Sequence, residues 1–266
     1  MTRSLVIAPQ WIGDAVMTEP LLRRLHARGE TLTVGALPWV APVYRAMPQV
    51  AVVLELPFAH GGLQWTARRS LARQLRGQFD VAYVGPNSFK SALLPWWAGI
   101  RKRVGYHGES RYGVLNQRLP NPPEGHRPPM VAFYSALSGE TGTAQDRPQL
   151  QLDPVAVDAA LAGMHLQRQG YYVFAPGAEY GPAKRWPPRH FAVLAEQLDA
   201  PVVLLGSAKE SALCAEIART VNTAQPGQCI DWSGRTSLDR ALATISAAKA
   251  MVSGNGQPLA DSTACT

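Results

Sequence analysis

Residues 174–195 have the sequence FAPGAEYGPAKRWPPRHFAVLA, which joins an apolar strand to an amphipathic helix. The turn between them holds four prolines together with Glu179, Lys184 and Arg185. A turn that enters a helix is suited to bind an anion, because free backbone N–H groups and the positive end of the helix dipole meet there. The stretch therefore favours a diphosphate clamp. A proline-rich connector with surface charges is the alternative, and neither a Walker A loop nor a GxGxxG loop is present.

Strand and helix patterns alternate on both sides of this turn. Apolar runs such as SLVIA (4–8) and YYVFAPG (171–177) alternate with amphipathic segments, and residues 141–153 resemble a linker. We expect one helix over residues 15–29 and a helix over residues 88–99 that is interrupted at Pro95. The alternation predicts an α/β fold with two Rossmann-like lobes, parallel sheets and ligands outside the carboxyl ends of the strands.

Charge and cysteine content indicate the compartment and the partners. Residues 1–150 contain 17 lysines and arginines against nine acidic residues, a net charge of +8, whereas residues 151–266 carry −1. A basic first half suggests an anionic partner, although an ordinary solvated surface explains it as well. The three cysteines do not have the spacing of metal ligands, and so low a number suits a reducing cytosol. The short apolar run before Pro9 is typical of a buried strand rather than a signal peptide. We therefore expect a cytoplasmic protein, with no cofactor or metal.

Polar residues at the ends of the predicted strands are the first candidates for a site. Asp14 lies at a helix start, where an aspartate is usually an N-cap. Asn87, Ser88 and Lys90 follow a strand and suit either a ligand site or a helix cap. Gly206, Ser207 and Lys209 lie at another strand end and suit either a ligand contact or a turn. Trp11 either lines a ligand site or simply packs against its neighbours.

Four stretches carry a resemblance to a known family: PQWIGDAVMTEPLLRRL (9–25), PNSFKSALLPWWAGIRKRVGYHGESRYGVLN (86–116), PGAEYGPAKRWPPRHFAVLA (176–195) and SGRTSLDRALATISAAKAMVS (233–253). Together they resemble the lipopolysaccharide heptosyltransferases of glycosyltransferase family nine. The resemblance implies a GT-B fold, with an acceptor-binding domain at 1–155 and a partial ADP-heptose-binding domain at 156–253. It also implies inverting transfer of L-glycero-D-manno-heptose from ADP-heptose to the first heptose of heptosyl-Kdo2-lipid A.

The resemblance also implies roles for residues. Asp14 becomes the general base, and Lys184 neutralises charge on the leaving diphosphate. Gly13 lets the acceptor come close. The full set of substrate-binding candidates is Trp11, Gly13, Asn87, Lys90, Gly177, Glu179, Arg185, Gly206 and Ser207.

Two further expectations concern the helix at 63–78 and the last residues. Arg69, Arg73 and Arg76 share one helical face opposite Ala67, Leu71 and Leu75, which predicts peripheral binding to the anionic inner face of the inner membrane. Residues 254–266 depart from the family pattern, as in a truncated or frameshifted chain. We therefore expect an incomplete second sheet with an open edge and little transfer activity. A nucleotide-sugar-binding relic and a sugar-nucleotide epimerase are the alternatives, and no nucleic-acid-binding motif is present.

Overall fold

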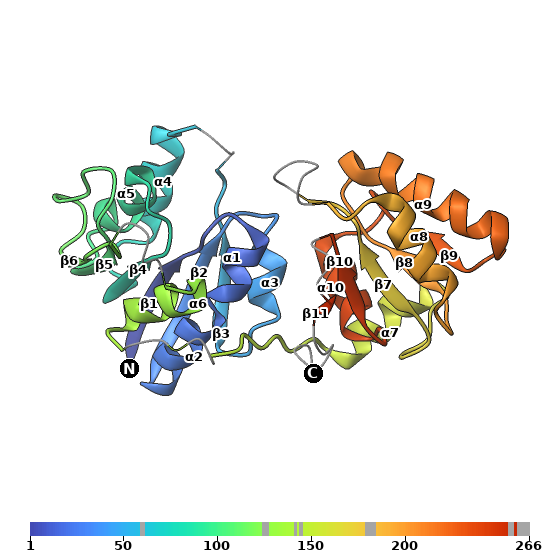
Figure 1. Cartoon of the computed structure of the whole chain (residues 1–266). Helices are drawn as coiled ribbons and strands as arrows, with labels where there is room; N and C mark the ends of the chain where they lie inside the picture. Colours follow the sequence, from blue (N-terminus) through green and yellow to red (C-terminus); the bar gives the residue numbers. More distant parts are fainter. Residues whose placement is uncertain are drawn as a thin grey trace. The chain divides into compact units, whose positions relative to one another are not determined.

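The computed structural model describes residues 1–58, 62–123, 128–140, 143, 146–178, 185–254 and, as backbone, 258–259. The chain divides into two compact units, Met1–Gln151 and Leu152–Thr266 (Figure 1). This division lies shortly before the expected boundary after residue 155.

The first unit is built on a six-stranded parallel sheet. Its elements are β1 (Thr2–Ile7), α1 (Ile12–Met17), α2 (Glu19–Ala27), β2 (Glu30–Ala36), α3 (Ala41–Arg45), β3 (Val50–Glu55), α4 (Trp65–Gln74), β4 (Val81–Val84), α5 (Phe89–Trp97), β5 (Lys102–Tyr106), β6 (Gln117–Leu119), α6 (Met130–Ser135) and the 3-10 helix η1 (Ala136–Ser138). The strand order is β3-β2-β1-β4-β5-β6. This is the doubly wound order, whose direction reverses between β1 and β4, the place where such folds bind ligands.

The second unit repeats this plan on a shorter sheet. It contains α7 (Pro154–Ala162), β7 (Tyr172–Ala175), α8 (Pro188–Glu196), β8 (Val202–Leu204), the 3-10 helix η3 (Ala208–Glu210), α9 (Ser211–Ala224), β9 (Cys229–Asp231), α10 (Leu238–Ser246), β10 (Met251–Ser253) and β11 (Pro258–Leu259). The order is β11-β10-β7-β8-β9, and β11 is antiparallel to β10. The sequence predicts an incomplete sheet with an open edge; in the described residues β11 is the edge strand on this side, and it pairs with Met251 and Val252 of β10.

Burial on both faces of each sheet explains the uninterrupted apolar strands. In β7, Val173 packs in the core under α7 and α10, whereas its neighbour Phe174 packs in the core under α8 and α9. Successive strand residues point to opposite faces, so a sheet covered by helices on both sides needs an apolar residue at every position. This arrangement leaves the loops at the strand ends to carry the polar residues.

Two predicted helix boundaries differ from the structure, and each involves a proline. The helix expected at 15–29 is two helices, because Pro20 has no N–H for the carbonyl of Val16 and the Thr18 hydroxyl donates to the carbonyl of Ala15 at 2.6 Å. Conversely, α5 continues through Pro95 and ends at Trp97. Pro95 and the two leucines before it are buried, so packing outweighs the lost backbone hydrogen bond, a cost of about 3 kcal/mol.

Three elements escaped the sequence pattern. The strands β6 and β9 have only three residues each. Helix α7 begins directly after the segment 141–153 that resembles a linker, and its signal was present: the Asp153 side chain accepts a hydrogen bond from the N–H of Val155, and Pro154 takes the first helical position. An N-cap followed by proline therefore marks this helix better than its periodicity does.

Candidate active site

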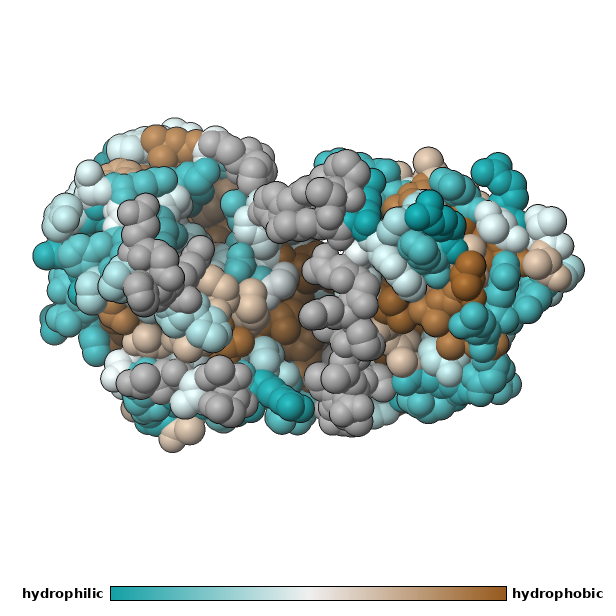
Figure 2. Space-filling model, viewed as in Figure 1, coloured by the Kyte–Doolittle hydropathy of each residue, from teal (hydrophilic) through white to brown (hydrophobic). Residues whose placement is uncertain are grey.

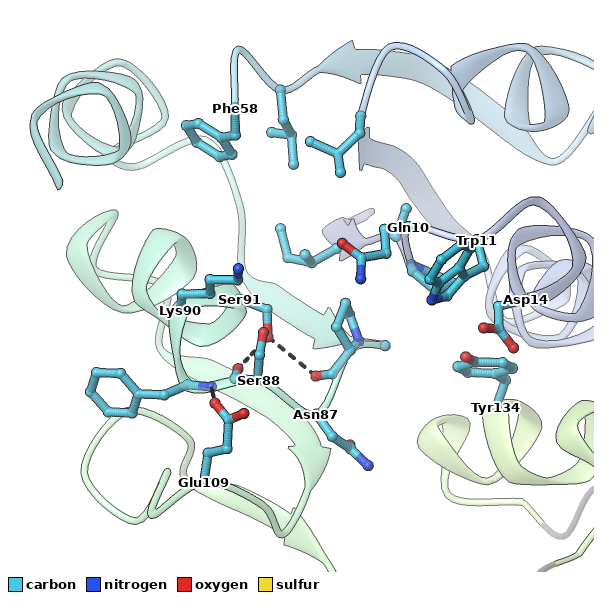
Figure 3. Close-up of a pocket in the computed structure, with 18 of the residues that line it drawn as sticks. Gln10, Trp11, Asp14, Phe58, Asn87, Ser88, Lys90, Ser91, Glu109 and Tyr134 are labelled. Atoms are coloured by element: carbon cyan, nitrogen blue, oxygen red, sulfur yellow. Dashed lines mark hydrogen bonds between the residues drawn. The ribbon is translucent and has the colours of Figure 1, made fainter. Parts of the chain in front are cut away.

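A cavity of about 850 Å³ opens in the first unit at the carboxyl ends of β1 and β4, on the side where the strand order reverses (Figure 3). Its walls come from the loops after these strands and from α4, α5 and α6. The lining residues are Ile7, Ala8, Pro9, Gln10, Trp11, Asp14, Leu37, Leu56, Phe58, Leu63, Arg68, Gly85, Pro86, Asn87, Ser88, Phe89, Lys90, Ser91, Glu109, Met130, Phe133 and Tyr134. Four predicted residues, Trp11, Asp14, Asn87 and Lys90, are therefore brought together on one cavity.

Asp14 is placed in the cavity wall by the start of α1. The N-cap residue is Trp11, with extended backbone, so Asp14 lies in the first helical turn and is not the N-cap. The Asp14 side chain is half-buried. In Figure 3 it faces the side chain of Tyr134, which comes from α6. Gly13 is exposed and does not line the cavity.

Two buried tyrosines support the wall behind Asp14. The hydroxyls of Tyr44 and Thr18 lie 3.1 Å apart, and both residues are buried. Burial raises the pKa of Tyr44, and the nearby Tyr134 and Asp14 raise it further, against the Thr18 hydrogen bond that lowers it. Tyr44 therefore stays neutral, and Asp14 is a carboxylate of the cavity wall on this side.

The Asn87 loop is held by a buried cation. Arg111 is only 1% exposed, and its guanidinium donates to the carbonyl of Pro86 at 2.7 Å, to Asn87 Oδ1 at 3.2 Å and to the carbonyl of Tyr106. Burial lowers the pKa of Arg111, against the nearby carboxylate of Glu109. The three acceptors fix the loop between β4 and α5, so the Asn87 side chain has a structural role whatever it binds.

The start of α5 is capped from a distant loop. Ser88 is the N-cap residue of α5, but the Glu109 carboxylate accepts from the N–H of Phe89 at 2.6 Å. A cap by a neighbouring side chain was the alternative for the residues after β4, and here the cap comes from residue 109 instead. Lys90, the residue after Phe89, also lies in the cavity wall, with its ammonium group directed into the hollow (Figure 3).

Arg68 is a cavity residue that the sequence pattern missed. It is 7% exposed, donates to the carbonyls of Leu63 at 2.8 Å and Lys90 at 3.3 Å, and lies 4.0 Å over the ring of Phe58. Burial lowers its pKa. The signal was its position three residues before Leu71, on the buried side of the helix, where arginine is rare without a partner. The cavity wall thus carries two cations, from α4 and α5.

In the second unit, the predicted glycines surround a carboxylate that was not predicted. Glu210 accepts from the N–H of Ser207 at 2.6 Å, and a Cβ at Gly206 would lie 3.1 Å from its carboxylate. A Cβ at Gly177 would overlap the same carboxylate. Ser207 is the N-cap of η3 in a capping box with Glu210, so a turn-forming role holds for it.

The remaining candidates belong to the segment after β7, where the sequence predicts a diphosphate clamp. Arg185 is exposed, and its guanidinium donates to the carbonyl of Ala178 at 3.4 Å. Glu179 and Lys184 lie outside the described residues. In the part of the chain that is described, no group of three or more His, Cys, Asp or Glu side chains is arranged to hold a metal ion.

Sequence comparison places these features in a family. The model of glycosyltransferase family 9 (heptosyltransferase) matches residues 68–256. The chain is 42% identical to lipopolysaccharide heptosyltransferase 2 of Escherichia coli K12 over 264 residues, which cover 93% of this chain and 76% of the relative. This chain belongs to glycosyltransferase family 9.

Solved structures of the family agree with the fold. The structure of E. coli ADP-heptose LPS heptosyltransferase II has a TM-score of 0.84 and 39% identity, and the match covers 96% of this chain and 79% of that one. A family 9 glycosyl transferase from Veillonella parvula, at 16% identity, matches with a TM-score of 0.78 over 95% of this chain and 74% of its own, which supports the fold alone. The predicted GT-B fold and the predicted glycosyltransferase class are confirmed. The comparisons favour neither the epimerase nor the binding-only alternative.

Proposed function

We propose that this family 9 glycosyltransferase transfers L-glycero-D-manno-heptose from ADP-heptose to the first heptose of the lipopolysaccharide inner core, with inversion at the anomeric carbon. The E. coli relative of known structure is described as an ADP-heptose LPS heptosyltransferase, and its identity of 39% supports the same donor here. The observation that carries the proposal is the half-buried Asp14 carboxylate in the cavity wall at the strand-order reversal.

The chemistry needs one base and one stabilised leaving group. In an inverting transfer the acceptor hydroxyl attacks the anomeric carbon from the face opposite the diphosphate, and a carboxylate takes its proton. Asp14 has the required charge and position, while the nearby Tyr44 is held neutral by burial. The new glycosidic bond forms as the bond to ADP breaks, so Asp14 gains the proton and the diphosphate gains the negative charge.

The first unit would bind the acceptor. Heptosyl-Kdo2-lipid A carries carboxylates and phosphates, and charge-assisted hydrogen bonds from Arg68 and Lys90 in the cavity wall would suit such groups. Trp11 is 44% exposed and lines the same cavity, so its ring would cover a sugar face. Asn87 and Gly13 would complete the approach of the acceptor.

The second unit would bind ADP-heptose. Gly177, Gly206 and Ser207 follow β7 and β8 at the carboxyl edge of the second sheet, where this fold class binds nucleotides. Glu179 and Arg185 belong to the same clamp, and Lys184 would neutralise the diphosphate as the bond breaks.

The test of the base is Asp14→Asn. We expect turnover to fall by about 10²-fold or more, as for loss of a general base, while affinity for ADP-heptose changes little. Asp80→Asn is the matched control, because Asp80 precedes β4 at the opposite edge of the sheet and pairs with Arg3 at the surface. Turnover of Asp14→Asn close to that of Asp80→Asn would remove Asp14 from the mechanism.

The test of the clamp is Lys184→Ala. We expect weaker ADP-heptose binding by calorimetry and slower transfer, because a charged partner of the diphosphate is lost. Arg185→Ala, an exposed neighbour of the same charge, is expected to have a smaller effect. Equal ADP-heptose affinity in Lys184→Ala and the unmodified protein would contradict the assignment.

We also propose that the protein works in the cytoplasm at the anionic inner face of the inner membrane. Arg69, Arg73 and Arg76 are exposed along α4 and its C-terminal turn, and each would contribute roughly 1 kcal/mol near such a surface. In the described residues, no helix has the length and apolar character to cross a bilayer. Reversal of all three arginines to glutamate should reduce binding to anionic liposomes and leave ADP-heptose binding intact; unchanged liposome binding would remove these arginines from the proposal.

A further inference from the structure

Three tryptophans of α4 and α5 form one surface cluster, which we call the tryptophan face. The rings of Trp65 and Trp97 meet edge to face with centroids 4.6 Å apart, and the ring of Trp96 lies 6.3 Å from that of Trp97. Trp97 packs on the core, but Trp65 and Trp96 are 46% and 43% exposed. Two exposed rings that both contact Trp97 point to a partner surface, because single apolar residues scattered over a surface need no partner.

The two segments that carry the tryptophan face contain no aspartate or glutamate. Residues 62–78 and 86–104 contain eight lysines and arginines and no aspartate or glutamate. The Arg69 guanidinium of α4 lies 5.8 Å over the ring of Trp97, so a cation flanks the rings directly. Tryptophan among basic residues is the composition of protein segments that settle at the headgroup level of an anionic bilayer, with the rings in the interface and the cations at the phosphates.

The same region forms the mouth of the cavity. Leu63, two residues before Trp65, is 44% exposed and lines the cavity, and so does Phe89, which is 37% exposed at the start of α5. Figure 2 shows apolar residues at the surface of the first unit over α4. An apolar surface thus continues from the cavity to the tryptophan face, on the same pair of packed helices.

We propose that the tryptophan face inserts into the interfacial layer of an anionic phospholipid bilayer and so places the cavity mouth at the membrane surface. The proposal rests on the proposed function, since a glycolipid acceptor anchored in that bilayer would reach the cavity along Leu63 and Phe89. It goes beyond electrostatic attraction, because the arginines alone would hold the protein above the headgroups, whereas the rings would enter them.

Vesicle binding tests the proposal without any sugar substrate. The probe is vesicles of phosphatidylglycerol and phosphatidylethanolamine, with brominated lipids to quench tryptophan fluorescence. The test variant combines Trp65→Ser with Trp96→Ser, and Trp39→Ser is the matched control, a tryptophan of the same unit that is 42% exposed and lies between β2 and α3. Thermal melting confirms that all variants are folded.

We expect the double variant to bind vesicles at least about tenfold more weakly, which corresponds to 1.4 kcal/mol, and to lose most of the quenching by brominated lipid. The control should bind like the unmodified protein. Transfer to a water-soluble, delipidated heptosyl-Kdo acceptor should be unchanged in the double variant. If the proposed function itself is wrong, the unmodified protein shows no such transfer, whereas the vesicle result stands on its own.

Three outcomes would overturn the inference. The first is equal vesicle binding by the double variant and the control. The second is vesicle binding by the unmodified protein without quenching by brominated lipid, since the rings would then stay outside the interface. The third is preferential binding of RNA or DNA that the double variant loses, because the tryptophan face would then be a nucleic-acid surface.

Discussion

Gly177 faces a carboxylate that leaves no room for a side chain, and this makes Gly177→Ala a sharp test of the second unit. A Cβ at this position would overlap the carboxylate of Glu210 and lie 3.0 Å from its Cγ. The backbone of Gly177 is outside the left-handed region, so alanine is compatible with the backbone itself. The substitution therefore acts through Glu210 alone.

The expected magnitude follows from what Glu210 loses when it moves. Its carboxylate accepts from the N–H of Ser207 at 2.6 Å in the capping box of η3. A lost cap of this kind costs about 1–2 kcal/mol. Replacing glycine by alanine stabilises the folded state by about 0.4–1 kcal/mol, because the unfolded chain then has less conformational entropy. We expect Gly177→Ala to destabilise the second unit by about 1 kcal/mol, the difference of these values.

A double-mutant cycle separates this cause from general backbone strain. In a Glu210→Ala background the obstructing carboxylate is absent, so Gly177→Ala should be neutral or stabilising by up to about 1 kcal/mol. The assay is chemical denaturation, with hydrogen exchange at the amides of β7 and β8 to report on the second unit. Equal destabilisation by Gly177→Ala in both backgrounds would refute the reasoning.

Three other predictions concern stability and reactivity. Arg111→Met should lower the unfolding free energy by about 3 kcal/mol in thermal denaturation, because three oxygen acceptors lose a charged donor; a loss below about 1 kcal/mol would contradict this. Burial raises the pKa of Cys214 to about 11 and that of Cys229 to about 12, so both thiols should resist alkylation at pH 8 until urea unfolds the protein, and rapid native alkylation would count against it. The pKa of Glu140, hydrogen-bonded to Arg28 of α2, and that of Asp146, bonded to the N–H of Thr143, lie below their ordinary values of 4.5 and 3.8. Their contribution to the free energy of unfolding should persist from neutral pH down to the ordinary pKa values and be lost as the pH falls through the lowered values. The measurement is the hydrogen-exchange protection of α2 relative to intrinsic exchange, which should fall below about pH 4 and not above it.

The alternation of strands and helices was predictable because it depends on neighbouring residues. The buried runs of β4 and β8 and the amphipathic spacing of α9 all carry local signals. Local rules failed where tertiary contacts opposed them: α5 continues through Pro95 because its surroundings bury that segment. The three-residue strands were missed for the related reason that so short a run has no periodicity of its own.

The candidate site likewise contains some residues that the sequence indicates and others that only the structure reveals. Asp14 and Asn87 could be selected from the sequence, since each follows a predicted strand in a stretch that resembles the family. Arg68 and Glu210 could not, because their importance lies in contacts with distant segments: Arg68 with the ring of Phe58 and the carbonyl of Lys90, and Glu210 with the backbone of Gly177.

The sequence by itself determined the α/β class, the alternation of strands and helices in two lobes, and the family. Periodicity and motif spacing are properties of contiguous residues. Only the tertiary structure decided that β1 and β4 are neighbours, and hence that residues 11–14 and 87–90 share one cavity. The physical reason is that strand order is set by the packing of helices on both faces of the sheet, a sum over contacts between distant segments. The tryptophan face has the same origin, since Trp65 and Trp97 meet only when α4 packs on α5.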